Sequence, residues 1–204
     1  MKIEKFTTGQ LMTNSYILSN DKKECIIIDP GLMYKNVSNY INNNYKVLAI
    51  LLTHGHFDHI DGISYFLNTP IYLYKDEKEV FDDFDKNLYY MLDRISPFKC
   101  DDLNINYLND LDSFQISDFF IKVIHTPGHT IGSCCYLIND SLFTGDTLFK
   151  LSVGRWDFPT GNYDTLIESL KKLKNMFNCN INCYPGHNDE TTLDYEKKYN
   201  SFLK

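Results

Sequence analysis

Three histidines and one aspartate lie within six consecutive residues in the first third of the chain. They are His54, His56, Asp58 and His59, in the segment T-H-G-H-F-D-H at residues 53–59. Imidazole nitrogens and carboxylate oxygens are ligands for zinc, manganese and iron. Because His54 and His56 are two positions apart, an extended backbone points both to one side, where they can bind one ion. Asp58 and His59 can then reach a second ion, so this segment predicts a metal site.

A buried strand is predicted to position this segment. Residues 47–52 form an apolar run that is typical of a fully buried strand. Reactive residues of α/β sheets collect at the carboxyl ends of strands, where this run ends. Residues 60–67 then show helical spacing of apolar side chains. Asp58 and His59 should therefore lie near a helix N-terminus, where the positive end of the helix dipole favours a carboxylate.

The second half of the chain repeats this arrangement, with a strand that ends next to a residue able to bind metal. Strands are predicted at residues 119–124, 134–138, 141–143 and 181–184, the middle two as a hairpin. The residues delivered at the ends of the first, third and fourth strands are His129, Asp146 and His187. Four strand ends thus supply five of the six histidines and two carboxylates, with His125 left out of the count.

Two polar residues beside these ligands are predicted to have supporting roles. His125 lies four residues before His129, with a proline between them, and is interpreted as a structural residue or as one that contacts a ligand. Asp29 ends a predicted strand. It either orients a ligand histidine or is a turn carboxylate, and the sequence does not separate the two.

The remaining elements alternate along the chain. Strands are predicted at residues 2–6, 15–18, 25–29 and 70–74, and helices at residues 37–43, 75–85 and 163–177. Residues 87–109 are the least regular part. Their aromatic residues are predicted to pack against the body of the protein, with a lid over the site as the alternative.

Length and composition are those of a globular domain. The 204 residues fit a single domain, 1–204, built from two pseudo-repeated halves at about 1–115 and 116–204, with 43% hydrophobic residues. No apolar run approaches the roughly 18 residues of a membrane span. The first residues lack the apolar core of a signal peptide. We therefore expect a cytoplasmic protein with no membrane partner, as a monomer or homodimer.

The cysteines and the charge limit the chemistry further. The six cysteines form no C-x-x-C pair, so reduced thiols are expected rather than a disulfide framework. The net charge of −7 argues against nucleic acid as a partner, because a phosphate backbone attracts basic surfaces. A small-molecule substrate is expected instead.

Four motifs, T-H-G-H-F-D-H, T-P-G-H-T, T-G-D-T and P-G-H, resemble the motif series of the metallo-β-lactamase-fold hydrolases. The chain is most similar to their short bacterial glyoxalase II-like group, over nearly its whole length. The resemblance implies an α/β fold, an αβ/βα four-layer sandwich of two mixed β-sheets flanked by helices. It also implies that the first metal is held by His54, His56 and His129, the second by Asp58, His59 and His187, and that Asp146 bridges them.

This resemblance predicts a binuclear metallo-hydrolase. Two divalent ions, zinc first and iron or manganese as alternatives, would share a bridging hydroxide, because metal lowers the pKa of bound water to about 7. Asp146 would bridge the ions, and Asp58 would accept a hydrogen bond from the hydroxide. A thiolate leaves readily because a thiol pKa is about 8.5. A thioester such as a hydroxyacylglutathione, or a related small ester, is therefore the predicted substrate.

Several departures from the group bear on the substrate. Only 17 residues follow His187, so the helical domain that grips glutathione in the long glyoxalase II enzymes is not expected. Arg155 stands where those enzymes have a basic glutathione contact, but Asp157 replaces their tyrosine. Arg155 therefore either binds a substrate carboxylate or pairs with Asp157. Trp156, where a small hydroxyl residue is common, is a second candidate substrate contact.

Two other activities of the same fold remain as alternatives. Persulfide dioxygenases resemble this motif series but use a single iron, and they usually carry alanine where Gly186 stands here. Phosphodiesterases and nucleases are disfavoured by the negative charge.

Overall fold

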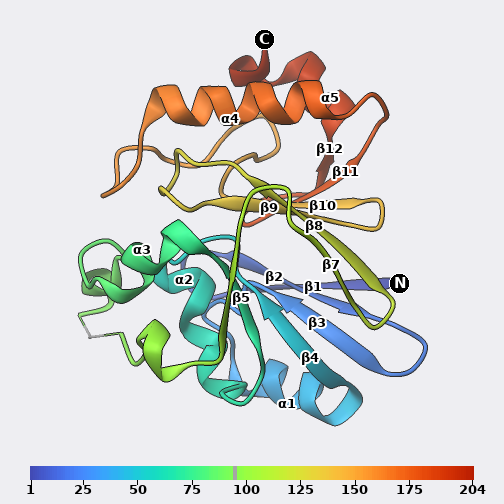
Figure 1. Cartoon of the computed structure of the whole chain (residues 1–204), viewed down its shortest axis with the longest axis vertical. Coiled ribbons are helices and arrows are strands. Elements are labelled where there is room, and N and C mark those ends of the chain that lie inside the picture. The colour runs from blue at the N-terminus through green and yellow to red at the C-terminus, as the bar shows by residue number, and fades with distance from the viewer. Residues whose placement is uncertain (94–95) are drawn as a thin grey trace.

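Two six-stranded sheets lie face to face, with helices on their outer sides (Figure 1). The computed structural model describes residues 1–93 and 96–204. The N-terminal part of the chain forms one sheet and the C-terminal part the other. The predicted fold class, an α/β sandwich of two mixed sheets flanked by helices, is confirmed.

The first sheet has the strand order β1-β2-β3-β4-β5-β6. Strands β1 to β3 are antiparallel neighbours, whereas β3 to β6 run parallel. A parallel arrangement brings the carboxyl ends of β3, β4 and β5 to one edge. The strands are β1 (Lys2–Thr8), β2 (Thr13–Ser19), β3 (Glu24–Ile28), β4 (Lys46–Leu51), β5 (Ile71–Tyr74) and β6 (Ile105–Leu108).

The second sheet has the order β12-β11-β10-β9-β8-β7. Its strands are antiparallel except for β10 and β11, which run parallel. The predicted hairpin is present, with Ser141 opposite Ile138 and a two-residue turn between them. The strands are β7 (Ser113–Ile116), β8 (Phe119–His125), β9 (Cys134–Ile138), β10 (Ser141–Gly145), β11 (Asn182–Pro185) and β12 (Thr191–Thr192).

The helices cover the outer faces of the sheets. In Figure 1, α1 and α2 lie outside the first sheet, and α4 and α5 outside the second. Their bounds are α1 (Lys35–Asn44), α2 (Phe57–Ile60), α3 (Lys78–Asp82), α4 (Tyr163–Met176) and α5 (Leu193–Tyr199). No helix in the described part of the chain is both long and apolar enough to span a membrane.

Alternating side chains build three apolar layers. Along β2, Ile17 packs with the cluster beneath α1, whereas the next residue, Leu18, packs between the sheets. In the second sheet, Tyr136 of β9 faces the space between the sheets and its neighbour Cys135 faces α4. This period of two is what a strand buried on both faces produces. All six cysteines are free, and all but Cys179 are buried, as expected for reduced thiols.

The structure corrects one predicted helix and shortens another. Residues 75–85 do not form one charged surface helix, because a 3-10 turn (Lys75–Glu77) precedes the short α3 and Glu77 points inward. Residues 60–67 are mostly 3-10, since α2 ends at Ile60 and a 3-10 helix (Asp61–Tyr65) follows.

Part of the segment at residues 87–109 packs against the first sheet, as predicted, and residues 105–108 form β6. Leu88, Tyr89, Phe98 and Cys100 belong to the apolar cluster on that side. Met91 is half exposed and lines the pocket described below, so the lid alternative stays a prediction. Residues 94–95 of this segment lie outside the described residues.

Candidate metal centre

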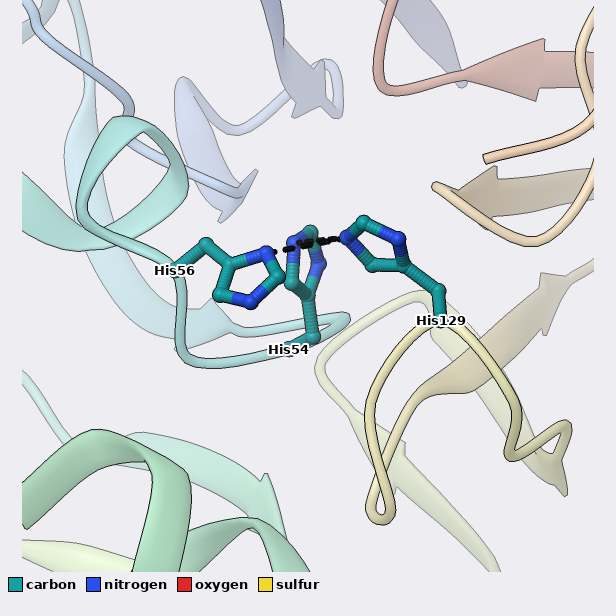
Figure 2. Close-up of side chains that lie close together, drawn as sticks. All are labelled: His54, His56 and His129. Carbon is teal, nitrogen blue, oxygen red and sulfur yellow. Dashed lines mark hydrogen bonds between the residues drawn. The ribbon is translucent and has the colours of Figure 1, made fainter. Parts of the chain in front are cut away.

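Four strand ends bring the predicted ligands together at one edge of the sandwich. The loop after β4 carries His54 and His56, and the loop after β8 carries His129. His129 Nε2 lies 3.2 Å from His54 Nε2 and 2.9 Å from His56 Nδ1. Figure 2 shows the three rings converging from these two loops. Their nitrogens form one group that could hold a metal ion.

Two of these rings, those of His129 and His54, make a hydrogen bond through Nδ1. This bond orients the other ring nitrogen, Nε2, toward the place where the three histidines meet. His129 Nδ1–H donates to Arg155 O at 2.6 Å, and His54 Nδ1 lies 3.1 Å from Thr53 Oγ1. Each ring therefore presents Nε2 with a lone pair, the arrangement found in metal-bound histidines.

Burial keeps the three rings neutral. It lowers the pKa of His54, of His56 and of His129, and neighbouring histidines lower the pKa of the first two further. Three unprotonated nitrogens that face one another repel unless a cation lies between them. The donor set therefore fits a divalent metal ion.

Asp58, His59 and His187 form a second group beside the first. The distance from Asp58 Oδ2 to His187 Nε2 is 3.3 Å and to His59 Nε2 is 3.5 Å. His187 Nδ1–H donates to Leu11 O at 3.0 Å, which leaves Nε2 as the inward acceptor. His59 Nε2 is buried without a hydrogen-bond partner in the described residues, as a metal ligand would be before its ion binds.

Asp146, at the end of β10, lies between the two groups. Its Oδ2 is 3.5 Å from both His129 Nε2 and His187 Nε2, and its Oδ1 is 3.4 Å from His59 Nε2. Oδ1 is buried and, within the described chain, accepts no hydrogen bond. One carboxylate thus faces both sets of nitrogens.

The site holds negative charge for a cation to neutralise. Burial alone would raise the pKa of Asp58 and of Asp146, but the histidines around them outweigh it. The pKa of Asp58 falls to about 2, and that of Asp146 lies well below its usual range. Burial likewise opposes protonation of His59 and His187, yet the facing carboxylates raise the pKa of both. The carboxylates beside His59 and His187 thus favour positive charge at these two rings, either as a proton or as a metal ion.

Asp29 orients one of the histidines. Its Oδ2 accepts from His59 Nδ1–H at 2.9 Å and from the Thr53 hydroxyl at 2.6 Å, while Oδ1 accepts from Thr53 N at 2.8 Å. Of the two roles that the sequence left open, the structure shows the orienting one.

Two supporting residues were missed in the sequence. Thr13, at the start of β2, donates its hydroxyl to Asp58 Oδ2 at 2.7 Å. Glu77 accepts hydrogen bonds from both histidine loops, and burial raises its pKa to about 7 although those hydrogen bonds oppose the shift. Both lie far along the chain from their partners, so local patterns carried no signal for them.

His125 lies apart from the metal-binding groups. Its ring stacks on Tyr74 with centroids 3.9 Å apart, and its Nε2 lies 3.0 Å from Ile131 O. These contacts are structural, as predicted for this residue.

Arg155 and Trp156 have different surroundings. The Arg155 guanidinium makes two bonds of 2.8 Å to Asp157 and lies over the Phe158 ring at 4.1 Å, so the predicted pair is present. Arg155 also lines the pocket at the metal-binding groups. Trp156 packs against Tyr163 and Phe202 instead, and the described lining of that pocket does not include it.

A pocket of about 280 Å³ opens onto the metal-binding groups. His56, Asp58, His129, Asp146 and His187 form its polar floor. Its walls are apolar, apart from Arg155. They consist of Leu11, Phe57, Leu88, Met91, Phe149, Val153 and Phe158.

A two-sheet sandwich with paired histidine and aspartate groups at one edge defines a metallo-hydrolase. A family model described as the metallo-beta-lactamase superfamily matches residues 8–181. The chain belongs to this superfamily, which confirms the resemblance found in the sequence.

Three similar proteins make the comparison more specific. The hydroxyacylglutathione hydrolase GloC of Haemophilus influenzae is 31% identical, over 100% of this chain and 98% of that protein. The structure of the BLEG-1 B3 metallo-beta-lactamase is 32% identical, with a TM-score of 0.88 and 100% of both chains covered. The structure of TTHA1623 in a di-iron-bound form is 30% identical, with a TM-score of 0.83, covering 98% of this chain and 100% of its own.

Proposed function

We propose that this protein is a binuclear metallo-hydrolase that cleaves thioesters. The position of Asp146 carries the proposal, because its two oxygens face His59 on one side and His129 and His187 on the other. His54, His56 and His129 would hold one divalent ion, and Asp58, His59 and His187 the other. Asp146 would contact both.

Divalent ions at these groups would lower the pKa of bound water to about 7 and polarise the carbonyl of the substrate. The protein's own residues fix the geometry. Thr13 and Asp29 hold Asp58 and His59 in place through hydrogen bonds of 2.7 and 2.9 Å. Asp58, ionised because its pKa is about 2, can accept a hydrogen bond from the attacking water. Zinc is the first expectation, with iron or manganese as alternatives, and the di-iron form of TTHA1623 supports iron.

The surroundings of the site favour a leaving group that needs no proton. Within the described lining of the pocket, the residues beyond the proposed ligands are apolar, apart from Arg155. Arg155 remains protonated at neutral pH and is no general acid. A thiolate leaves without protonation, since a thiol pKa is about 8.5, whereas an amine does not. The similarity to GloC supports a hydroxyacylglutathione or another small thioester.

Arg155 is the candidate contact for the end of such a substrate. Its side chain is 63% exposed at the pocket, and its pair with Asp157 fixes its direction. A carboxylate on the substrate would have to share the guanidinium with Asp157, so it would contribute modestly to binding.

The geometry at Gly186 disfavours the mononuclear persulfide dioxygenase. A Cβ atom at Gly186 would overlap Asp146 Oδ1 and lie 2.7 Å from His59 Cε1. The alanine usual in those enzymes would therefore crowd the second group, whereas glycine leaves it open.

The deciding experiment combines metal analysis of the purified protein with a substrate panel. We expect two metal equivalents per chain, turnover of S-lactoylglutathione and simpler thioesters, and loss of activity with EDTA. Turnover of a β-lactam far above that of thioesters would favour the activity named for the similar BLEG-1 structure and contradict the proposal. One iron per chain with oxygen uptake on glutathione persulfide would contradict the proposal. So would turnover of bis-p-nitrophenyl phosphate far above that of thioesters.

A further inference from the structure

A buried carboxylate joins the two loops that carry the first group of histidines. Glu77 lies at the end of the 3-10 turn after β5 and is fully buried. Its Oε1 accepts from Gly55 N at 2.7 Å, between His54 and His56 in sequence. Its Oε2 accepts from the Thr130 hydroxyl and from Gly132 N, both at 2.8 Å, in the loop that carries His129.

The surroundings of Glu77 are shaped to admit this carboxylate. A Cβ atom on Gly132 would lie 2.6 Å from Glu77 Cβ, and one on Gly55 would lie 3.3 Å from Oε1. The Gly132 loop can therefore approach the side chain this closely only because glycine stands there, and at Gly55 a Cβ would make a tight contact. A buried carboxylate is costly unless hydrogen bonds compensate it, and here all three donors come from the histidine loops.

We propose that Glu77 is a positioning residue that sets the separation of the His54–His56 loop from the His129 loop before a metal ion binds. The inference rests on the proposed function in one respect, namely that these three histidines hold a cation. Glu77 acts through the backbone of Gly55 and through Thr130 and Gly132, and it contacts no reacting atom.

The contacts of Glu77 also predict which of the two groups of proposed metal ligands depends on it. Within the described residues, the side-chain hydrogen bonds of Glu77 all go to the two loops of the first group. Asp58 and His59 are held by Thr13 and Asp29 instead. Loss of Glu77 should therefore weaken the first group and leave the second unchanged.

Glu77→Gln tests this with little change in shape. The amide keeps one acceptor oxygen but replaces the other with an NH₂ group, which cannot accept from a backbone N–H. The side chain can then accept from Gly55 N or from Gly132 N, but not from both, so one of the two loops loses its backbone hydrogen bond to residue 77.

The assay isolates each group by removing a ligand of the other. In a His187→Ala background, competition with a chromogenic chelator for Zn²⁺ reports the first group. There, Glu77→Gln should weaken binding about 10- to 100-fold, as changes to residues that orient ligands do. In a His129→Ala background, which reports the second group, the same change should leave affinity within about twofold.

Glu196 supplies a matched control. It is also fully buried, and it accepts from Leu151 N, the Thr191 hydroxyl and Asn200 Nδ2 at 2.8, 2.6 and 2.9 Å. Glu196→Gln should lower the Tm as Glu77→Gln does, yet leave Zn²⁺ affinity in the His187→Ala background unchanged. An equal loss of affinity in this control would show that destabilisation alone explains the effect, and would overturn the proposal.

Other outcomes are equally decisive. Unchanged affinity in Glu77→Gln, or equal losses in both backgrounds, would overturn the positioning role while leaving the ligand assignment intact. Failure of both backgrounds to bind Zn²⁺ would instead contradict the ligand assignment and both proposals. If Glu77→Gln does not fold, Thr130→Val replaces it. Thr130→Val should weaken the first group, and Thr130→Ser, which keeps the hydroxyl, should restore it.

Discussion

The hydrogen bond from Thr13 to Asp58 gives the most quantitative prediction. The Thr13 hydroxyl is buried and donates to Asp58 Oδ2 at 2.7 Å, the oxygen that also faces His59 and His187. Thr13→Val removes the donor at nearly constant volume. A hydrogen bond to a charged group contributes about 1.5–3 kcal/mol. Without this donor Asp58 is no longer held in its binding position, and the second metal ion should bind about 10- to 100-fold more weakly, the range typical of residues that orient ligands.

The opposite strand supplies the control. Thr8 pairs with Thr13 across the β1–β2 ladder and is also buried, but within the described chain its hydroxyl has no hydrogen-bond partner. Thr8→Val should therefore leave metal affinity unchanged. Zn²⁺ competition titrations of both variants, in a His129→Ala background, measure the difference. Equal affinities in the two variants would refute the view that Thr13 holds Asp58 in its binding position.

Three further predictions concern the site and its surroundings. Asp146→Ala should lose most of the second metal and at least about 100-fold in turnover, and retention of two metals per chain would contradict the bridging role. Gly186→Ala should lower the metal content toward one equivalent by elemental analysis, because the added Cβ overlaps Asp146 Oδ1. His125→Gln should keep both metals and cost about 1 kcal/mol, since it loses the ring stacked on Tyr74. Burial lowers the pKa of His125 in the fold, so the unfolded chain binds more protons below pH 6.5 and wild-type stability falls there. The difference in Tm between wild type and His125→Gln, measured with EDTA, should therefore narrow as pH falls through 6.5.

The proposed ligands could be found in the sequence because each lies in the loop or short helix that follows an apolar strand. The apolar runs before His54 and before His129 each end in a loop, and the face-to-face packing of the two sheets brings these two loops to one edge. The hairpin before Asp146 could also be predicted, because its turn is formed by two adjacent residues, Asn139 and Asp140. Motif resemblance then assigned the residues to two groups, which the geometry brings together.

The supporting residues could not be found in this way, because their contacts join distant segments. Thr13 and Asp58 are 45 residues apart, and Glu77 and Gly132 are 55 apart. Glu77 also stands in a charged stretch that is typical of a surface helix, so its sequence context predicts exposure. Only the packing of the two sheets, which brings Gly55 and Gly132 together, turns this side chain inward.

Because the first group spans both sheets, a cation bound there would also govern how long the folded chain survives. His54 and His129 are 75 residues apart in sequence, and bringing them together in an unfolded chain costs about 4 kcal/mol of loop entropy. The cation would therefore bind the native state almost exclusively. Free metal at a thousand times its Kd then adds about 4.1 kcal/mol to the free energy of unfolding. Metal supply would therefore set the catalytic rate of this protein. It would also set its abundance in the cell, because proteases degrade the unfolded chain.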